Sequence, residues 1–383
     1  MTIKRIQKTT HFHIFILLGA GLLLRIFFAA SNHGFGSDTA CFAAWADRMY
    51  TLGPSGFYSA DFFTDYPPGF MYVLYLVGAL KELFQIPTYS GIHLLLLKFP
   101  SILCDILCGY AIYKVGSERF TSREALFLTS FYLFNPAIIL NSSVWGQVDS
   151  VLTLFIVLMC LALIKGDMLP AYIAFGIGVL IKPQMLVFAP VLLAGILDHV
   201  FLRDFSIKKL LRNLFQGLGI IMGMLLLCLP FGLRNVLPQY INTLGSYPYV
   251  TVNGYNFWAL LGLSWVPQEN PLGFLTYQQW GVLVILLIVL LSLVISLRLK
   301  HNDTKYPLLG AFVILTMFLF SVRMHERYMY PGLVLLLLCY LYLPRKAVLR
   351  CYIGFSLLHF ATTSLTPREY SAQSATAANA SRP

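Results

Sequence analysis

Charged residues are scarce in this sequence. Lys, Arg, Asp and Glu make up 11% of its 383 residues, whereas hydrophobic residues make up 58%. A soluble globular domain carries about 25% charged residues, so the composition excludes one. It also excludes a disordered chain, because such chains lack apolar residues. The net charge of +11 comes without a basic stripe or a nucleic-acid-binding motif, so no nucleic-acid partner is expected.

Cysteine pairs and metal-binding motifs are also missing. The seven cysteines form no CxxC pair, which argues against zinc and redox chemistry. Most of them lie in apolar runs, where packing is their expected role. No metal-ligand spacing such as DxD is present. We therefore expect neither a metal nor another cofactor.

Long apolar runs are what the sequence has in abundance. They are bounded by Pro, Gly and charged residues and lie at about 12–30, 91–113, 124–140, 150–165, 168–181, 184–201, 214–232, 279–297, 306–322, 329–343 and 351–365. A membrane-spanning helix needs about 20 mostly apolar residues. The runs therefore predict an all-α fold, a polytopic transmembrane helical bundle in a lipid bilayer. We expect one domain at 1–366 and a polar, disordered tail at 367–383.

The basic residues predict how this bundle is oriented. A cytoplasmic N-terminus places 17 of the 27 Lys and Arg residues in cytoplasmic loops, as the positive-inside rule requires. The apolar run at 69–86 does not fit as a span, because a crossing there would move Lys114, Arg119 and Arg123 outside. We expect it to lie in the outer interface as an amphipathic or re-entrant helix.

Two long external loops follow from this topology, at 31–90 and 233–278. Loops of that length are usually functional. Polar residues gather in them and at the outer ends of the spans, and ionisable groups at such a depth indicate a functional site. The candidates are Asp38, Asp65, Tyr66, Gln147, Asp149, Lys182, Arg323, His325, Glu326 and Arg327.

Structural interpretations compete with a functional one at several of these positions. Asp38, Asp65 and Asp149 each stand near the start of an expected helix, where a carboxylate is a good cap. Lys182 precedes a proline at a helix break, and its long side chain is able to extend to the water.

Other charged residues are expected to be structural. Asp47 and Arg48 are predicted to form a solvated pair. Lys98 and Asp105 are seven residues apart, hence on one helix face, and are predicted to form an ion pair inside the membrane. For Arg25 the sequence leaves two alternatives open, extension to the water or contact with a lipid phosphate.

The order of the motifs resembles the GT-C superfamily of polytopic glycosyltransferases. An acidic residue after the first span is followed by DYPP (65–68), WGQVDS (145–150), KPQ (182–184), VNGYNFW (252–258) and HERY (325–328). The resemblance covers roughly residues 15–335. Within the superfamily the chain looks most like the dolichyl-phosphate-glucose-dependent glucosyltransferases of N-glycan assembly and bacterial membrane mannosyltransferases. WGQVDS and VNGYNFW follow the bacterial pattern, which implies a bacterial plasma membrane.

The resemblance implies an inverting enzyme that takes a hexose from a polyprenyl-phosphate-linked sugar donor. Transfer would occur on the extracytoplasmic face, to a glycolipid, glycan or protein acceptor. By matching positions, Asp38 would be the general base, Asp65 would shape the site, and His325 and Glu326 would lie near the donor. At position 327 this chain has Arg where the eukaryotic enzymes have Lys, and the two cations differ in geometry.

The residue types suit this chemistry. One carboxylate is needed to take the proton of the acceptor hydroxyl. The departing lipid phosphate gains negative charge, which Lys182, Arg323 and Arg327 are placed to stabilise. The aromatic residues of the second loop either stack on sugar faces or anchor the interface, and these are Tyr247, Tyr249, Tyr255 and Trp258.

Two other classes of function compete with a transferase. A transporter or flippase for a lipid-linked sugar would favour inverted repeats and charges at the midplane of the membrane. No repeat is apparent here, and the charges are predicted to lie at one face. A non-catalytic scaffold subunit is disfavoured because it would not need so many clustered ionisable residues.

Overall fold

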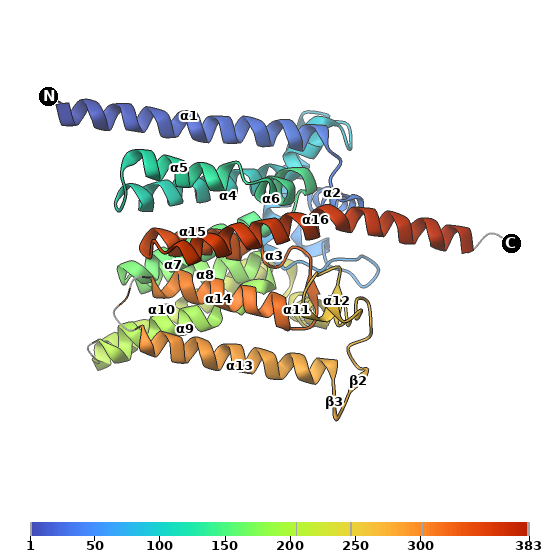
Figure 1. Ribbon diagram of the computed structural model, residues 1–383. Helices are drawn as coiled ribbons and strands as arrows, with labels where there is room; N and C mark the ends of the chain where they lie inside the picture. The colour runs from blue at the N-terminus through green and yellow to red at the C-terminus, as the bar shows by residue number, and fades with distance from the viewer. Residues whose placement is uncertain (1, 204, 246, 300–301, 303, 381–383) are drawn as a thin grey trace.

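The computed structural model describes residues 2–203, 205–245, 247–299, 302 and 304–380. The helices of its main body run side by side in an elongated bundle (Figure 1). They are α1 (Thr2–Ser31), α4 (Gly91–Ser117), α5 (Ser122–Leu133), α6 (Pro136–Ile139), α7 (Asp149–Lys165), α8 (Met168–Ile181), α9 (Ala189–Ile196), α10 (Ile207–Cys228), α13 (Tyr277–Arg298), α14 (Lys305–Phe320), α15 (Tyr330–Tyr342) and α16 (Lys346–Ala380). Short 3-10 or π turns extend some of them, at η2 (Leu140–Trp145), η3 (Pro183–Phe188), η4 (Leu197–Leu202) and η5 (Leu229–Phe231).

Each predicted apolar run is helical, although the run at 124–140 is divided into α5 and α6, and the run at 184–201 into η3, α9 and η4. Among the described residues, five helices are long and apolar enough to cross a membrane, at Phe12–Ser31, Gly91–Ser117, Pro183–Leu202, Ile207–Phe231 and Tyr277–Arg298. A sixth candidate is α5 together with Pro136–Trp145, which is bent by 44°. Shorter apolar helices, α8, α14 and α15, pack beside them. The predicted all-α polytopic bundle is confirmed.

The elements outside the bundle gather at one of its ends (Figure 1). They belong to the two long loops and to the α14–α15 link, and are α2 (Gly36–Leu52), η1 (Pro54–Gly56), α3 (Pro68–Leu83), α11 (Leu233–Gly245), β1 (Thr251–Val252), α12 (Phe257–Leu260), β2 (Pro271–Leu272), β3 (Leu275–Thr276) and β4 (Met324–His325). The α4–α5 and α15–α16 links, which carry predicted cytoplasmic charges, lie at the opposite end (Figure 1). The two sets of loops are thus separated by the length of the bundle. Which end faces the cytoplasm stays a prediction.

The segment predicted as an interfacial or re-entrant helix is α3. It starts at Pro68, and proline suits the first turn of a helix because the amide proton it lacks would have no helical partner there. Helix α3 packs closely on α2, because a side chain at Gly78 would lie 2.4 Å from the backbone oxygen of Ala46. Both carboxylate oxygens of Asp47 on α2 accept hydrogen bonds from the Lys81 ammonium on α3, at 2.8 Å each. These contacts join the two helices of the first loop into one unit.

The predicted solvated pair of Asp47 and Arg48 is wrong. Asp47 binds Lys81, as described above, while Arg48 donates to the backbone oxygens of Phe57 and Gly56 at 2.7 and 2.9 Å. The two side chains diverge because they are adjacent on a helix and project about 100° apart around its axis. Asp47 thus links α2 to α3, and Arg48 links α2 to the segment at η1.

The predicted Lys98–Asp105 ion pair is also wrong. Asp105 instead accepts from Arg25 at 3.0 Å, and both side chains are fully buried. Three hydroxyls complete the shell of Asp105, those of Tyr132, Ser142 and Tyr330. Because Arg25 supplies the cation from α1, neither alternative foreseen for it, water or lipid phosphate, applies.

Lys98 has a separate role in the same region. Its ammonium donates to three backbone oxygens, those of Ala29, Asn32 and Val144, at 3.3, 2.6 and 3.0 Å. These carbonyls come from the end of α1 and from η2, so the side chain joins three segments.

The C-terminal helix α16 continues through Ala380. The extent of this helix does not test the predicted domain limits at 1–366 or the predicted disorder of the tail at 367–383, and both stay predictions. Residues 381–383 of that tail lie outside the described residues.

Candidate active site

A cavity of about 290 Å³ lies where the two long loops meet the end of the bundle. Segments far apart in sequence contribute to it: the first loop, the α8–η3 link with η3, the second loop, α13, and the end of α14 with the α14–α15 link. Six predicted site residues line it, namely Asp65, Tyr66, Lys182, Arg323, His325 and Arg327. Four others, Asp38, Gln147, Asp149 and Glu326, are not among its lining residues.

Asp65 reaches the cavity because the loop before α3 is held in place. Trp45 donates from its indole nitrogen to the Phe63 oxygen at 2.9 Å, and the Tyr58 hydroxyl donates to the Tyr66 oxygen at 2.9 Å. The N-cap of α3 is Pro67 and no side chain caps it, so Asp65 is not a helix cap. Burial raises the pKa of Asp65, and the nearby cations Arg327 and Lys182 oppose that rise.

Lys182 occupies the break between α8 and η3. Its extended backbone precedes Pro183, the first residue of η3. The ammonium lies 2.6 Å from Oδ1 of Asp149 and faces the rings of Tyr66 and Tyr328, at 5.7 and 5.9 Å from their centres. With 5% of the residue exposed, the interpretation of a lysine extending to water is wrong. The carboxylate and the two rings hold the cation inside the protein.

Asp149 holds Lys182 rather than capping its helix. It lies in the first turn of α7, whose N-cap is Val148. Its second oxygen accepts from Asn141 at 3.3 Å. Both carboxylate oxygens are bound and the residue is 1% exposed. Asp149 therefore does not line the cavity but holds Lys182 in position. The capping alternative is wrong.

Asp38 lies in the first turn of α2, where a negative charge interacts favourably with the helix dipole. The N-cap is Phe35 and makes no side-chain capping bond, so the capping alternative is again wrong. The half-buried carboxylate accepts a hydrogen bond from the amide of Gln147, which is 1% exposed. Asp38 is also close enough to Asp65 and Glu326 for its charge to raise the pKa of both carboxyls.

Residues 323–327 are placed by a short parallel strand pair. Strand β4 pairs with β1, so that His325 lies opposite Val252 in the second loop. Arg323 adopts a left-handed conformation, with a φ of 62°, and donates from Nε to Oε1 of Gln268 at 2.7 Å. The sharp turn and this bond bring the α14–α15 link against the second loop.

Arg327 is paired with its neighbour. One terminal nitrogen donates to Oε1 of Glu326 at 2.6 Å. Burial raises the pKa of Glu326, and the charge of Arg327 opposes the rise. Glu326 is 2% exposed, so it positions the guanidinium that lines the cavity instead of facing the cavity itself.

His325 is packed between two tyrosine rings. The centres of the Tyr247 and Tyr328 rings each lie 4.9 Å from the centre of the imidazole. Burial lowers the pKa of His325 well below 6.5, and the positive charges of Arg327 and Lys182 lower it further. The folded protein therefore keeps this imidazole neutral at physiological pH.

This lowered pKa predicts a loss of stability in mild acid. Below pH 6.5 the unfolded chain binds a proton at His325 that the folded protein does not, so stability falls as the pH drops from 6.5 toward the lowered pKa. At one unit below 6.5 the loss is about 1 kcal/mol. We expect the decrease in apparent Tm between pH 7.5 and 5.5 to be smaller in His325→Gln than in the unmodified protein. Substitution of the exposed His33 is the control, and equal decreases in all three proteins would contradict the prediction.

The aromatic residues of the second loop divide into two groups. Tyr247 lines the cavity and is positioned to contact a ligand. Trp258 is 5% exposed and donates to the Phe320 oxygen at 2.9 Å, so it packs against the end of α14 and is not available to a sugar. Tyr249 packs on Trp265, with ring centres 5.2 Å apart. Trp258 of the VNGYNFW motif thus holds the second loop against α14.

Four further polar residues line the cavity but were not predicted as site residues: Gln184, Thr243, Ser321 and Tyr328. The first and last belong to the KPQ and HERY motifs, which could have indicated them. Thr243 lies on α11, and no local pattern distinguishes it from its neighbours. Within the described residues no three His, Cys, Asp or Glu side chains gather as a metal ion would require, and metal independence stays a prediction.

Part of the chain is similar to a known protein family. Residues 66–233 match the family model described as dolichyl-phosphate-mannose-protein mannosyltransferase, a GT-C family domain. The matched segment includes Gln147, Asp149 and Lys182, while Asp38, Asp65 and 323–327 lie outside it. No curated protein matches the sequence. The family match covers less than half of the chain and supports a polyprenyl-phosphate-sugar-dependent glycosyltransferase in general, while the apolar helices indicate an integral, multi-pass membrane protein.

Proposed function

We propose that this protein is an inverting glycosyltransferase. It takes a hexose from a polyprenyl-phosphate donor and passes it to a glycolipid, glycan or protein acceptor on the extracytoplasmic face of the membrane. The observation that carries the proposal is the cavity at one end of the bundle, where Lys182 and Arg327 face the same space as Asp65. The transfer needs cations for the phosphate, which this cavity holds, and a carboxylate base, a role that we give to Asp38, which lies outside the lining but close enough to raise the pKa of Asp65.

Asp38 is the proposed general base. An inverting transfer is a single displacement, in which the acceptor oxygen bonds to the anomeric carbon as the bond from that carbon to the phosphate oxygen breaks. The acceptor proton goes to the base and the electron pair of the broken bond goes to the lipid phosphate. Gln147 supports this role, because its amide donates to the Asp38 carboxylate and orients it. The bound amide leaves carboxylate lone pairs available to the acceptor hydroxyl.

The cations stabilise the phosphate as it leaves. Preorganised positive groups in a site shielded from water interact strongly with charge that develops in the transition state. Asp149 and Glu326 fix Lys182 and Arg327 through bonds of 2.6 Å each. We therefore assign these two acids a positioning role and the two cations contact with the donor. Arg323 and the neutral His325 also line the cavity.

The apolar part of the same cavity suits the lipid of the donor. Its lining continues along Leu186 and Val187 in η3, Ile285 on α13 and Met317 on α14. These helices belong to the membrane bundle, and the exposed surface of α13 is rich in leucine. A donor with its phosphate at Lys182 would have its isoprenoid chain along these side chains, in contact with the bilayer.

Sugar transfer by the purified protein tests the proposal. The full chain in nanodiscs is supplied with polyprenyl-phosphate mannose or glucose and with glycolipid, glycan and Ser/Thr-peptide acceptors. We expect transfer from at least one of these donors, to a product whose new linkage has the anomeric configuration opposite to that of the donor. A retained configuration would contradict inversion. Use of a nucleotide sugar in place of every lipid-linked donor would contradict the donor class.

A further inference from the structure

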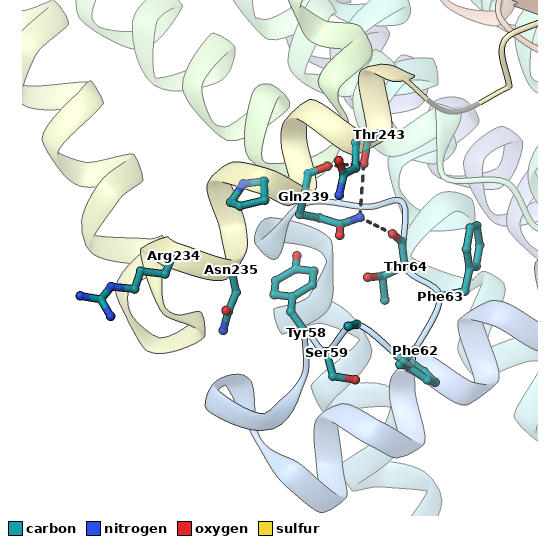
Figure 2. Close-up of a pocket in the computed structure, with 12 residues that line it drawn as sticks. Tyr58, Ser59, Phe62, Phe63, Thr64, Arg234, Asn235, Gln239 and Thr243 are labelled. Atoms are coloured by element: carbon teal, nitrogen blue, oxygen red, sulfur yellow. Dashed lines mark hydrogen bonds between the residues drawn. The ribbon is translucent and has the colours of Figure 1, made fainter.

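A second cavity lies beside the first, between the first loop and α11 (Figure 2). Its volume is about 410 Å³, within the range of about 300–1,000 Å³ typical of small-molecule sites. We call it the α11 pocket. Its walls are formed by Tyr58, Ser59, Ala60, Phe62, Phe63 and Thr64 from the first loop and by Arg234, Asn235, Pro238, Gln239, Asn242 and Thr243 from α11.

The α11 pocket offers neutral polar groups and aromatic rings. It is lined by three side-chain amides, three aliphatic hydroxyls and three aromatic rings, and no carboxylate is among the twelve lining residues. Its one cation, Arg234, is exposed, and in Figure 2 its side chain extends away from Tyr58 and Gln239. Amides both donate and accept hydrogen bonds, as the hydroxyls of a sugar do. Of the rings, Phe63 is exposed and offers an apolar face to the C–H face of a sugar, whereas Tyr58 is buried and Phe62 is covered by the Arg48 guanidinium.

The α11 pocket shares a wall with the proposed donor cavity. Thr64 lines the former and the next residue, Asp65, lines the latter, while Thr243 lines both. The amide of Gln239 donates to the Thr64 oxygen and to the Thr243 hydroxyl, which fixes this wall (Figure 2). A ligand in the α11 pocket therefore lies one residue of backbone away from the residues that face the donor.

We infer that the α11 pocket binds a neutral carbohydrate, the portion of the acceptor next to the hydroxyl that receives the new sugar. The inference rests on the proposed function and narrows it to a glycan or glycolipid acceptor. A peptide is less well suited, because extended peptides are usually recognised along a strand edge or an apolar groove. The lining of this pocket comes from a loop and a helix, with no strand among the twelve residues.

Direct binding of oligosaccharides tests this inference without turnover. The full chain in nanodiscs is mixed with maltotetraose, cellotetraose, mannotetraose or a hexapeptide rich in Ser and Thr, and contact is measured by saturation-transfer NMR. We expect at least one tetrasaccharide to bind and the peptide to give no signal. Asn235→Trp fills the pocket and should weaken tetrasaccharide binding at least tenfold. Asn235→Ala removes one neutral hydrogen-bonding group and should weaken it about fivefold.

Leu237→Trp is the matched control. Leu237 is an exposed residue of the same helix that does not line the pocket, so this variant should bind as the unmodified protein does. Equal binding by Asn235→Trp and Leu237→Trp would overturn the inference. So would a lack of binding by every tetrasaccharide, or binding of the peptide alone. If Asn235→Trp fails to fold, the milder Asn235→Ala decides.

Failure of this inference and failure of the proposed function give different results. Asp38→Asn should retain tetrasaccharide binding while losing sugar transfer. An unmodified protein that binds a tetrasaccharide but never transfers a sugar supports the pocket and contradicts the proposed function. A protein that transfers sugar to peptides and binds no tetrasaccharide contradicts the pocket alone.

Discussion

Replacing Asp38 by Asn is expected to lower kcat for sugar transfer by about 10²–10⁴-fold, the usual contribution of a general base. The amide of the variant cannot take up the acceptor proton, whereas its oxygen still accepts the bond from Gln147. The fold and the donor cavity, which Asp38 does not line, should be unchanged. Initial rates at varied donor concentration should therefore show a lower kcat with nearly the same KM for the donor.

Asp61→Asn is the matched control for this experiment. Asp61 is an exposed residue of the same loop and lines neither the donor cavity nor the α11 pocket. Its substitution should leave kcat unchanged. If Asp38→Asn keeps more than a tenth of the activity and Asp65→Asn loses it, the base is Asp65 and the role assigned to Asp38 is wrong.

Replacing Arg25 by Met is expected to lower the free energy of unfolding by about 3–5 kcal/mol, because Asp105 is left as an unpaired buried charge. Both side chains are fully buried where α1 packs on α4. The three hydroxyls that also bind Asp105 satisfy its lone pairs but supply no opposite charge. The expected change is measured as the apparent Tm in detergent, at one fixed scan rate because unfolding of such proteins is often irreversible.

Two variants test whether the unpaired charge of Asp105 causes the loss of stability in Arg25→Met. Arg25→Met combined with Asp105→Asn removes both charges and should recover most of the lost Tm. Lys81→Met breaks the Lys81–Asp47 bond at 2.8 Å, where the Asp47 side chain is 41% exposed, and should cost about 0–1 kcal/mol. A double variant as unstable as the single one would show that Arg25 acts through packing instead.

The helices were predictable because each is encoded in a continuous stretch of sequence. An apolar run of membrane length specifies a spanning helix whatever its neighbours are, so the predicted runs coincide with helices of the bundle. The partners of buried charges were less predictable. Asp105 pairs with Arg25, 80 residues away, and Lys98 binds carbonyls on two other elements. Spacing along one helix carries no information about such neighbours.

The candidate site was also only partly predictable from the sequence. The motifs DYPP, KPQ and HERY indicated Asp65, Lys182 and Arg327, and these three residues line one cavity. The motifs did not distinguish residues that face the cavity from those that hold them. Asp149 and Glu326 look equally functional in sequence, but each is buried and paired with a cation.

The α11 pocket had no sequence signal, because its lining is divided between two loops about 170 residues apart. Sequence alone determined the all-α bundle and indicated most of the charged residues that line the donor cavity, since these follow from local composition and short motifs. Only the tertiary structure decided which charges pair, which of them face a cavity, and that a second cavity shares a wall with the first. Those properties depend on distances between segments, and the packing of the helices and loops sets these distances.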